Sequence, residues 1–155
     1  MHPAPIEARR DGYRVSTDPK RLDLDVIHRF LSETSYWAAG IPRSTVERSV
    51  RGSCCFGLYV EQSGEQVGFA RVITDYATFG YLGDVFVLPE HRGRGLSKWL
   101  VEQVMAHPDL QGFRRWILGT RDAHSLYTRF GFRPLARPEI FLEVHRPDVY
   151  MASSS

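Results

Sequence analysis

The stretch from Asp84 to Met105, DVFVLPEHRGRGLSKWLVEQVM, decides the fold of this 155-residue chain. The apolar run VFVL predicts a strand that ends before Pro89, and the residues from Leu96 onward have the apolar spacing of an amphipathic helix. Between the two elements, Gly93 and Gly95 permit positive φ angles, so successive backbone N–H groups can converge where the helix begins. A strand, a bend rich in N–H donors and a helix N-terminus together predict a site for phosphate oxygens.

This bend differs from the two best-known phosphate-binding loops. A Walker loop carries Lys and then Ser or Thr directly after its last glycine, whereas Gly95 is followed by Leu96 and Ser97. A Rossmann fingerprint needs a third small residue where Lys98 stands, and it opens the first strand-helix-strand unit rather than lying past mid-chain. The sequence therefore disfavours a nucleotide-binding protein of either kind.

The stretch instead resembles the signature of the GNAT superfamily of acyl-CoA-dependent N-acyltransferases, V-x-P-E-x-R running into R/Q-x-x-G-x-G/A. The matching residues are Val87, Pro89, Glu90, Arg92, Gly95 and Ser97. Ser97 departs from the Gly or Ala of the family, but it is also small. The resemblance implies acetyl-CoA (coenzyme A) as the cofactor. Its diphosphate would bind at Arg92, Gly93, Arg94, Gly95, Leu96 and Ser97, and its pantetheine arm would pair with the backbone of Val85, Phe86 and Val87.

Composition describes an ordinary globular chain. Hydrophobic residues make up 43% and charged residues 25%, and the formal charge of +2 favours neither nucleic acid nor an anionic membrane as a partner. No apolar run approaches a membrane span, and the N-terminus lacks the apolar core of a signal peptide, so we expect a cytoplasmic protein. Cys54 and Cys55 are adjacent in an apolar strand, which predicts reduced core residues on opposite faces and no metal site.

Hydrophobic periodicity predicts seven strands and four helices. The first helix would begin at Asp18 and Pro19, and the second at a capping box of Ser44 and Glu47. The strands are expected at residues 13–16, 54–61, 66–74, 79–88, 115–120, 131–135 and 140–144, and the helices at 19–33, from 44, from 96 and at 123–130.

In this order, the earlier strands of the sheet are joined by hairpins and the later strands are joined by helices. It predicts a single α/β (α+β) domain with a mixed, mostly antiparallel sheet of about seven strands and helices on both faces. The order matches that of the GNAT fold element for element. We expect a flexible lead over residues 1–10, a GNAT-like domain over 11–146 and a disordered tail over 147–155.

The segment from Ala123 to Phe132, AHSLYTRFGF, resembles a second family marker, A-x-x-L-Y-x-x-x-G-F. The resemblance places the hydroxyl of Tyr127 near the sulfur of coenzyme A, where it would protonate the departing thiolate. Many relatives carry an Asn seven residues before this tyrosine, and it makes a hydrogen bond to the cofactor. This chain has Thr120 at that position, and Asp122 or His124 could make the contact instead. The alternative is that Tyr127 has only a structural role, in which its ring packs in the core and its hydroxyl is hydrogen-bonded within the protein.

A primary amine must lose a proton before it attacks a thioester, so the reaction needs a base. Asp84 is the first candidate, because strand alternation places it on one face with Leu82 and Phe86, and a carboxylate among apolar neighbours is a stronger base. Relatives often place their base where this chain has Tyr81 and Gly83.

A β-bulge would therefore be needed to bring Asp84 into the pocket. The equal alternative is a structural carboxylate that caps a loop amide. Asp75, Glu33 and a chain of water molecules are the other options for the base.

The bend between the first two helices lines the acceptor pocket in the resembled family. Here it carries Tyr36 and Trp37, which would shape that pocket; the equal alternative is that Trp37 fills the core. Tyr76 and Phe79, before the motif strand, suggest an apolar or aromatic-lined entrance, and Asp75 beside them is also expected to contact the acceptor.

These observations predict a GNAT-family N-acetyltransferase (EC 2.3.1.-). It would move an acetyl group from acetyl-CoA to a primary amine of a small molecule, peptide or protein by direct attack in a ternary complex. The alternative is a noncatalytic module that binds or senses acyl-CoA. A Ser-His-Asp hydrolase would need a G-x-S-x-G elbow, which the sequence lacks. We expect a monomer or a homodimer.

Overall fold

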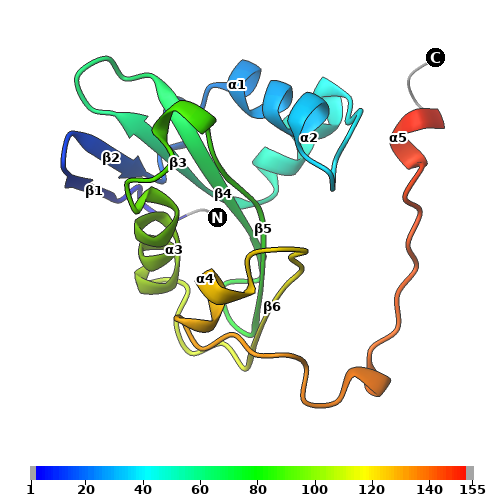
Figure 1. Ribbon diagram of the computed structural model, residues 1–155. Coiled ribbons are helices and arrows are strands. Elements are labelled where there is room, and N and C mark those ends of the chain that lie inside the picture. Colours follow the sequence, from blue (N-terminus) through cyan, green and yellow to red (C-terminus); the bar gives the residue numbers. More distant parts are fainter. Residues whose placement is uncertain (1–2, 153–155) are drawn as a thin grey trace.

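The computed structural model describes residues 3–152, and a sheet of six strands lies at its centre (Figure 1). Neighbouring strands follow the order of the chain, and all pairs are antiparallel except β5 with β6, which is parallel. The strands are β1 (Glu7–Arg10), β2 (Tyr13–Ser16), β3 (Cys54–Val60), β4 (Gln66–Thr74), β5 (Phe79–Val87) and β6 (Arg115–Leu118). The predicted single α/β domain with a mixed, mostly antiparallel sheet is confirmed.

Short helices connect these strands. They are η1 (Pro19–Arg21), α1 (Leu24–Arg29), η2 (Phe30–Thr34), α2 (Arg43–Arg51), η3 (Pro89–His91), α3 (Leu96–Ala106), α4 (His124–Thr128), η4 (Pro138–Ile140) and α5 (Val149–Ala152). The helix predicted over residues 19–33 is divided, because Asp18 caps only a 3-10 turn, while Asp23 accepts from two backbone N–H groups and starts α1. The capping box predicted at Ser44 is wrong: α2 begins directly after Pro42.

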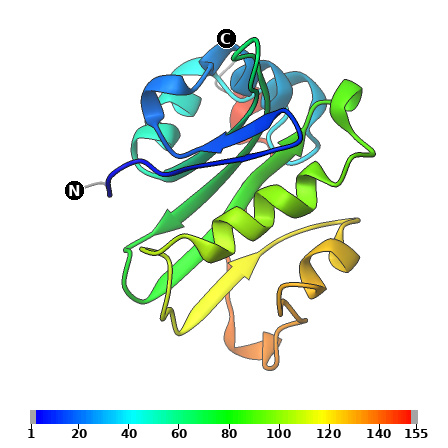
Figure 2. The same ribbon diagram turned by 90° about the vertical axis from the view of Figure 1, so that its left-hand side faces the viewer.

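Helices cover both faces of the sheet (Figures 1 and 2). α1, η2 and α2 pack over one face on a cluster that includes Phe69 and Phe86. α3 and α4 pack over the other face on a cluster that includes Leu58 and Leu100. Cys54 belongs to the second cluster and Cys55 to the first, so the two free thiols point to opposite faces, as the sequence predicted. No helix within residues 3–152 has both the length and the apolar character needed to cross a bilayer.

Strand β5 contains the β-bulge on which the position of Asp84 depends. Phe69 of β4 faces Phe86, but Arg71 faces Gly83, so β5 has one residue more than β4 over this interval. Asp84 accommodates the extra residue with a left-handed φ of 55°. Leu82 therefore packs under α3, while Phe86 packs under α1. The expectation that these two side chains share a face is wrong, because the bulge breaks the alternation between them.

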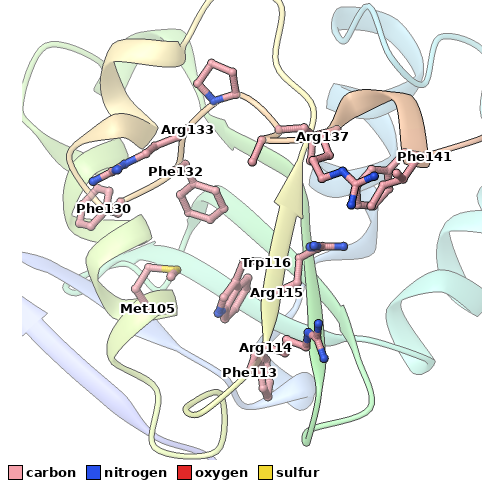
Figure 3. A pocket seen from close by; sticks show the side chains of 15 residues that line it. Met105, Phe113, Arg114, Arg115, Trp116, Phe130, Phe132, Arg133, Arg137 and Phe141 are labelled. Carbon is pink, nitrogen blue, oxygen red and sulfur yellow. The ribbon is translucent and has the colours of Figure 1, made fainter.

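The strands predicted over residues 131–135 and 140–144 are also wrong. Within the described part of the chain, these segments pair with no strand. Residues 131–137, with Ile140 and Phe141, instead line a cavity of about 460 Å³ beside β6, and Phe132 and Phe141 form part of its walls (Figure 3), whereas residues 142–144 are exposed. Pro134 and Pro138 each lack the N–H donor that a ladder would need.

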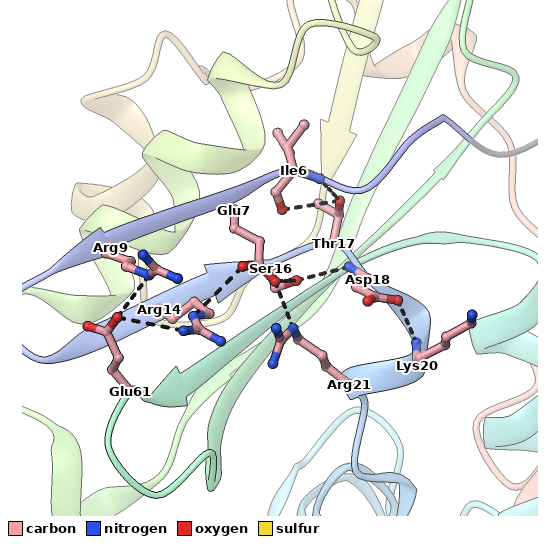
Figure 4. Close-up of polar contacts among 10 residues, drawn as sticks. All are labelled: Ile6, Glu7, Arg9, Arg14, Ser16, Thr17, Asp18, Lys20, Arg21 and Glu61. Carbon is pink, nitrogen blue, oxygen red and sulfur yellow. Dashed lines mark hydrogen bonds and ion pairs between the residues drawn. The ribbon is translucent and has the colours of Figure 1, made fainter.

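Residues 7–10 and 149–152 form regular structure that the sequence did not predict. β1 pairs with β2, although residues 1–10 were predicted to be a flexible lead. Glu7 accepts from Ser16 Oγ at 2.8 Å and lies 2.7 Å from Arg21 Nε, while Arg9 pairs with Glu61 at 2.8 Å (Figure 4). In the tail predicted to be disordered, residues 149–152 form α5. Residues 1–2 and 153–155 lie outside the described part of the chain.

Candidate functional site

The predicted phosphate-binding bend forms at the N-terminus of α3. Gly93 and Gly95 have φ angles of 80° and 73°, and a Cβ built on either would meet no atom within 4 Å. Within residues 3–152, none of the six backbone N–H groups from Gly93 to Lys98 donates to a protein acceptor. The bend therefore presents a row of unpaired donors to open space at the positive end of a helix, which is the arrangement that binds anions.

A cavity of about 320 Å³ opens at this bend. Six residues expected at the cofactor site line it: Val87, Arg92, Gly93, Gly95, Leu96 and Ser97. Arg92 Nε donates to the carbonyl of Val87 at 2.8 Å, which fixes the bend to the end of β5. Five further residues, His91, Lys98, Ser125, Leu126 and Arg129, complete the lining and were not among the expected site residues. The signals were present, since Lys98 lies in the first turn of the motif helix and Arg129 lies two residues after Tyr127.

Arg94 lies outside this lining. Its Nη1 donates to the hydroxyl of Tyr13 at 3.1 Å, and that hydroxyl is 2.8 Å from Nδ1 of His91. These contacts hold the bend against β2, so Arg94 stabilises the conformation of the bend through Tyr13.

A second cavity of about 690 Å³ gathers residues from several parts of the chain. Its lining includes Tyr36 and Trp37 from the bend between η2 and α2, Arg71 from β4, Tyr81, Gly83, Asp84 and Val85 from β5, and Thr120, Arg121, Asp122 and Tyr127 from the segment after β6. Both cavities use β5 and α4 as walls. The structure thus brings Asp84 and Tyr127 to one cavity, and their catalytic roles stay predictions.

Tyr127 is suited to hold a proton. Its side chain is buried, and its hydroxyl makes no hydrogen bond within residues 3–152. Burial, followed by the nearby Tyr36 and Asp122, raises the pKa of Tyr127 to about 12. The hydroxyl is therefore protonated at neutral pH and is free to donate to a bound molecule.

Asp84 lies among polar partners, so the expectation of an apolar setting is wrong. One oxygen accepts from Nε of Arg71 at 2.7 Å, and the other accepts from Nε1 of Trp37 at 2.8 Å. Arg71 also donates to Ser53 Oγ at 3.0 Å. The Arg71 and Asp84 side chains are 17% and 11% exposed. Sequence reasoning missed Arg71, although it is the one charged residue in the otherwise uncharged strand QVGFARVIT.

The aromatic residues of the bend line the second cavity rather than the core. Trp37 is 42% exposed and Tyr36 is 45% exposed, so the core-filling alternative for Trp37 is wrong. The hydroxyl of Tyr36 accepts from the backbone N–H of Arg121 at 2.9 Å, and the Arg121 guanidinium lies 3.9 Å from the centre of the Tyr36 ring. This contact joins the aromatic bend to the loop after β6.

Asp75, Tyr76 and Phe79 do not reach the second cavity. Asp75 accepts from the hydroxyl of Thr78 and from nearby backbone N–H groups, and the Thr78 hydroxyl first, then those groups, hold its pKa below the usual range. It is a turn residue and not a base. Tyr76 lines a separate cavity with Cys54, and Phe79 begins β5 at its opposite end. These three expectations fail because the antiparallel turn carries the residues away from the motif end of β5.

Besides Arg94, two residues expected at the cofactor site line neither cavity. The ring of Phe86 is buried and stacks on Phe30 with 4.0 Å between ring centres, so only its backbone can face a ligand. His124 is exposed at the start of α4. Within residues 3–152, no group of three His, Cys, Asp or Glu side chains is placed to hold a metal ion.

A family profile described as "Acetyltransferase (GNAT) family" matches residues 24–132, which is more than half of the chain. The chain belongs to the GNAT family of acetyltransferases. The match covers both motifs from which the resemblance was drawn, and it confirms a GNAT-family acyltransferase.

Relatives agree with this assignment. The Gibberella zeae protein named "Putative acetyltransferase FG08082" is 40% identical to this GNAT chain over 138 residues, which cover 76% of this chain and 77% of the relative. A Xanthomonas campestris crystal structure, described as "a putative acetyltransferase belonging to the gnat family", is 57% identical with a TM-score of 0.86 and covers 89% of this chain and 96% of its own. The structure of Rv2747 from Mycobacterium tuberculosis, described as a complex with CoA and NLQ, shares the fold at 21% identity and a TM-score of 0.59; the match covers 86% of this chain and 73% of that one.

Proposed function

We propose that this GNAT enzyme transfers an acetyl group from acetyl-CoA to a primary amine. The observation that carries the proposal is the pair of cavities that share β5 and α4. One cavity holds the unpaired N–H groups at the start of α3, and the other holds the unpaired hydroxyl of Tyr127. A diphosphate at the first cavity and a thioester at the second would match coenzyme A. The presence of CoA in the Rv2747 structure, on the same fold, supports this choice of ligand.

The residues present fit the coenzyme along its length. The bend supplies N–H donors for the diphosphate, and Arg92, Lys98 and Arg129 supply positive charge around it. β6 pairs with β5 only along residues 79–82, so the edge of β5 from Gly83 to Val87 has no strand partner on that side within the described chain. An extended pantetheine arm could add to this open edge as a short strand would.

Bound acetyl-CoA supplies an activated acetyl group, and the residues of this chain supply position and protons. The open edge of β5 orients the carbonyl, and the Tyr127 hydroxyl provides the proton that a leaving thiolate takes. Asp84 acts as a positioning residue, because both of its oxygens are engaged by Arg71 and Trp37. The proton of the amine passes to water in the exposed part of the second cavity.

The second cavity offers an apolar surface to an acceptor. It combines the exposed rings of Tyr36 and Trp37 with the carboxylate of Asp122 and with the guanidinium of Arg121, which lies over the Tyr36 ring. The two charges offset each other, so the contact area of the rings is what favours an amine with an apolar stem. We therefore place the amine acceptor at this cavity and not at the turn from Asp75 to Phe79.

A cytoplasmic location stays a prediction from the sequence.

The test measures release of free thiol from acetyl-CoA in the presence of a panel of primary amines, ordered by the length and aromaticity of the stem. We expect thiol release that depends on both substrates, together with calorimetric binding of coenzyme A and none of ATP. Binding of coenzyme A without turnover on any amine would instead support a sensing module. No binding of coenzyme A would overturn the proposal.

A further inference from the structure

A cavity of about 660 Å³ lies at the end of the sheet opposite the phosphate-binding bend, and we call it the α3-end cavity. It is bounded by the start of β3, the turn after β4 and the C-terminal end of α3, whereas the bend lies at the N-terminus of α3. The 11 residues of α3 separate the two places by about 16 Å. The lining shares no residue with either cavity of the proposed active site, and Leu22, Leu24 and Val50 make one wall apolar.

The wall of the α3-end cavity contains a buried histidine with an unused hydrogen-bond donor. His107 follows the last residue of α3 and is 1% exposed. Its Nδ1 accepts from the backbone N–H of Asp109 at 3.0 Å, so the ring proton is on Nε2. Nε2 is buried and makes no hydrogen bond to any residue from 3 to 152. A buried donor without an acceptor is costly and uncommon in native proteins, so it indicates a missing acceptor.

Tyr76 brings a second unused donor to the same cavity. Its φ of 61° is a left-handed conformation that bulky residues rarely adopt. The turn holds this conformation, because the backbone N–H of Tyr76 donates to Thr74 Oγ1 at 2.9 Å. The Tyr76 hydroxyl is buried without a hydrogen bond in the described chain, since the nearby Cys54 sulfur is a weak acceptor. Backbone strain at a residue with a functional group free to bind is typical of a ligand site.

Both donors are uncharged at neutral pH. Burial, against a smaller opposite effect of Asp109, lowers the pKa of His107, so its imidazole is neutral. Burial, followed by Cys54, raises the pKa of Tyr76, so its hydroxyl keeps its proton. Two neutral donors suit a neutral acceptor oxygen. A carboxylate would lose hydration without gaining a buried cation, because Arg51, the cationic residue of the lining, is exposed.

From these contacts we infer that the α3-end cavity is a second binding site, for a small neutral molecule with an apolar body and a carbonyl or hydroxyl oxygen. The apolar body lies against Leu22, Leu24 and Val50, and the oxygen accepts from His107 Nε2 and from the Tyr76 hydroxyl. Because both donors are buried behind the cavity surface, the Tyr76 ring moves aside as the oxygen enters. Its neighbours in the turn, residues 77 and 78, are exposed and leave room for this movement. This inference does not depend on the proposed reaction.

A titration of the full chain, followed by the NMR shifts of its backbone amides, tests this inference. The probe is acetophenone, and the controls are ethylbenzene, which has a methylene in place of the carbonyl, and benzoate, which is charged. Acetophenone should shift the amides of Leu24, Cys54 and His107 and leave those of Gly93 and Gly95 unchanged. Ethylbenzene and benzoate should each bind at least about 5-fold more weakly, because one has no acceptor and the other is an anion.

Two variants each remove one of the donors. Tyr76→Phe removes the hydroxyl and keeps the ring. His107→Asn removes the Nε2 donor, while the side-chain oxygen of Asn can still accept from the N–H of Asp109. Each variant should bind acetophenone roughly 5- to 10-fold more weakly and ethylbenzene as before. Tyr59→Phe is the matched control and should change neither, because Tyr59 also has a buried hydroxyl without a hydrogen bond in the described chain but lines a different cavity.

Urea unfolding separates a binding role from a structural one. Tyr76→Phe should keep the stability of the unmodified protein, because the hydroxyl has no hydrogen bond to lose in the free protein. A clear loss of stability in Tyr76→Phe, with the affinity for acetophenone unchanged, would assign the hydroxyl a structural role and overturn the inference. No shift of the cavity amides with about 20 mM acetophenone would also overturn it, as would ethylbenzene binding as tightly as acetophenone.

Discussion

The ion pair of Arg71 and Asp84 allows a test of whether Asp84 is a base or a positioning residue. Asp84→Asn keeps an acceptor for Trp37 and a residue type that tolerates the φ of 55°, but it removes the negative charge beside Arg71. Loss of one partner from a fully buried pair costs about 3–5 kcal/mol. With side chains that are 17% and 11% exposed, and with the bond from Arg71 to Ser53 kept, we expect a loss of about 2–3 kcal/mol.

The free energy of unfolding is measured by urea titration, and the unfolding temperature should fall by about 5–10 °C for a chain of this size. The double variant Arg71→Met, Asp84→Asn should be more stable than the sum of the single variants predicts, because the unpaired charge is gone. As a positioning residue, Asp84 should contribute less than about 10-fold to kcat, whereas loss of a general base costs about 100-fold or more. A fall of kcat beyond 100-fold at an unchanged unfolding temperature would refute the positioning role.

Three further predictions concern other residues. Tyr127→Phe should lower kcat by about 100-fold without changing the Kd of coenzyme A, as seen in initial rates and calorimetry. Because the pKa of Tyr127 is raised from 10.0 to about 12, its contribution to stability is complete below pH 10.0 and is lost as the pH rises through about 12, which alkaline unfolding curves would reveal. Gly95→Ala should cost about 1 kcal/mol at its φ of 73° and also weaken coenzyme A binding, whereas Gly12→Ala at a φ of 84° should cost the same and leave binding unchanged. Asp75→Ala should lower the unfolding temperature with no change in the KM of the amine. The Thr78 hydroxyl, and then backbone N–H groups, lower the pKa of Asp75, so the stability that Asp75 contributes is present above pH 3.8 and is lost as the pH falls below that value.

Local patterns predicted the parts of the site that local chemistry decides. The glycine spacing of the bend, the proline after β5 and the apolar period of α3 are all encoded within a short stretch, so the bend and its cavity formed where the sequence predicted a phosphate-binding site. Tyr127 reached the second cavity for the same reason, because the helix that carries it follows a strand and a short loop.

Features that depend on distant partners could not be derived in this way. The pairing of Arg71 with Asp84 requires the register of β4 on β5 and the position of one bulge. The alternation in residues 140–144 predicted a strand that the structure does not contain, because alternation alone does not say whether a sheet edge is there for the segment to join. A turn from Asp75 to Thr78 looks the same in sequence whether it points toward a site or away from it.

The contact between Tyr36 and Arg121 also has a consequence for how the two substrates would meet. It connects the bend between η2 and α2 to the loop that leads from β6 to Ala123, so one side of the proposed acceptor cavity is joined to the segment before α4, whose residues line both cavities. An amine that displaces the ring of Tyr36 must also disturb that loop. Because binding linkage is reciprocal, a factor by which the amine changes the affinity for coenzyme A is also the factor by which coenzyme A changes the affinity for the amine.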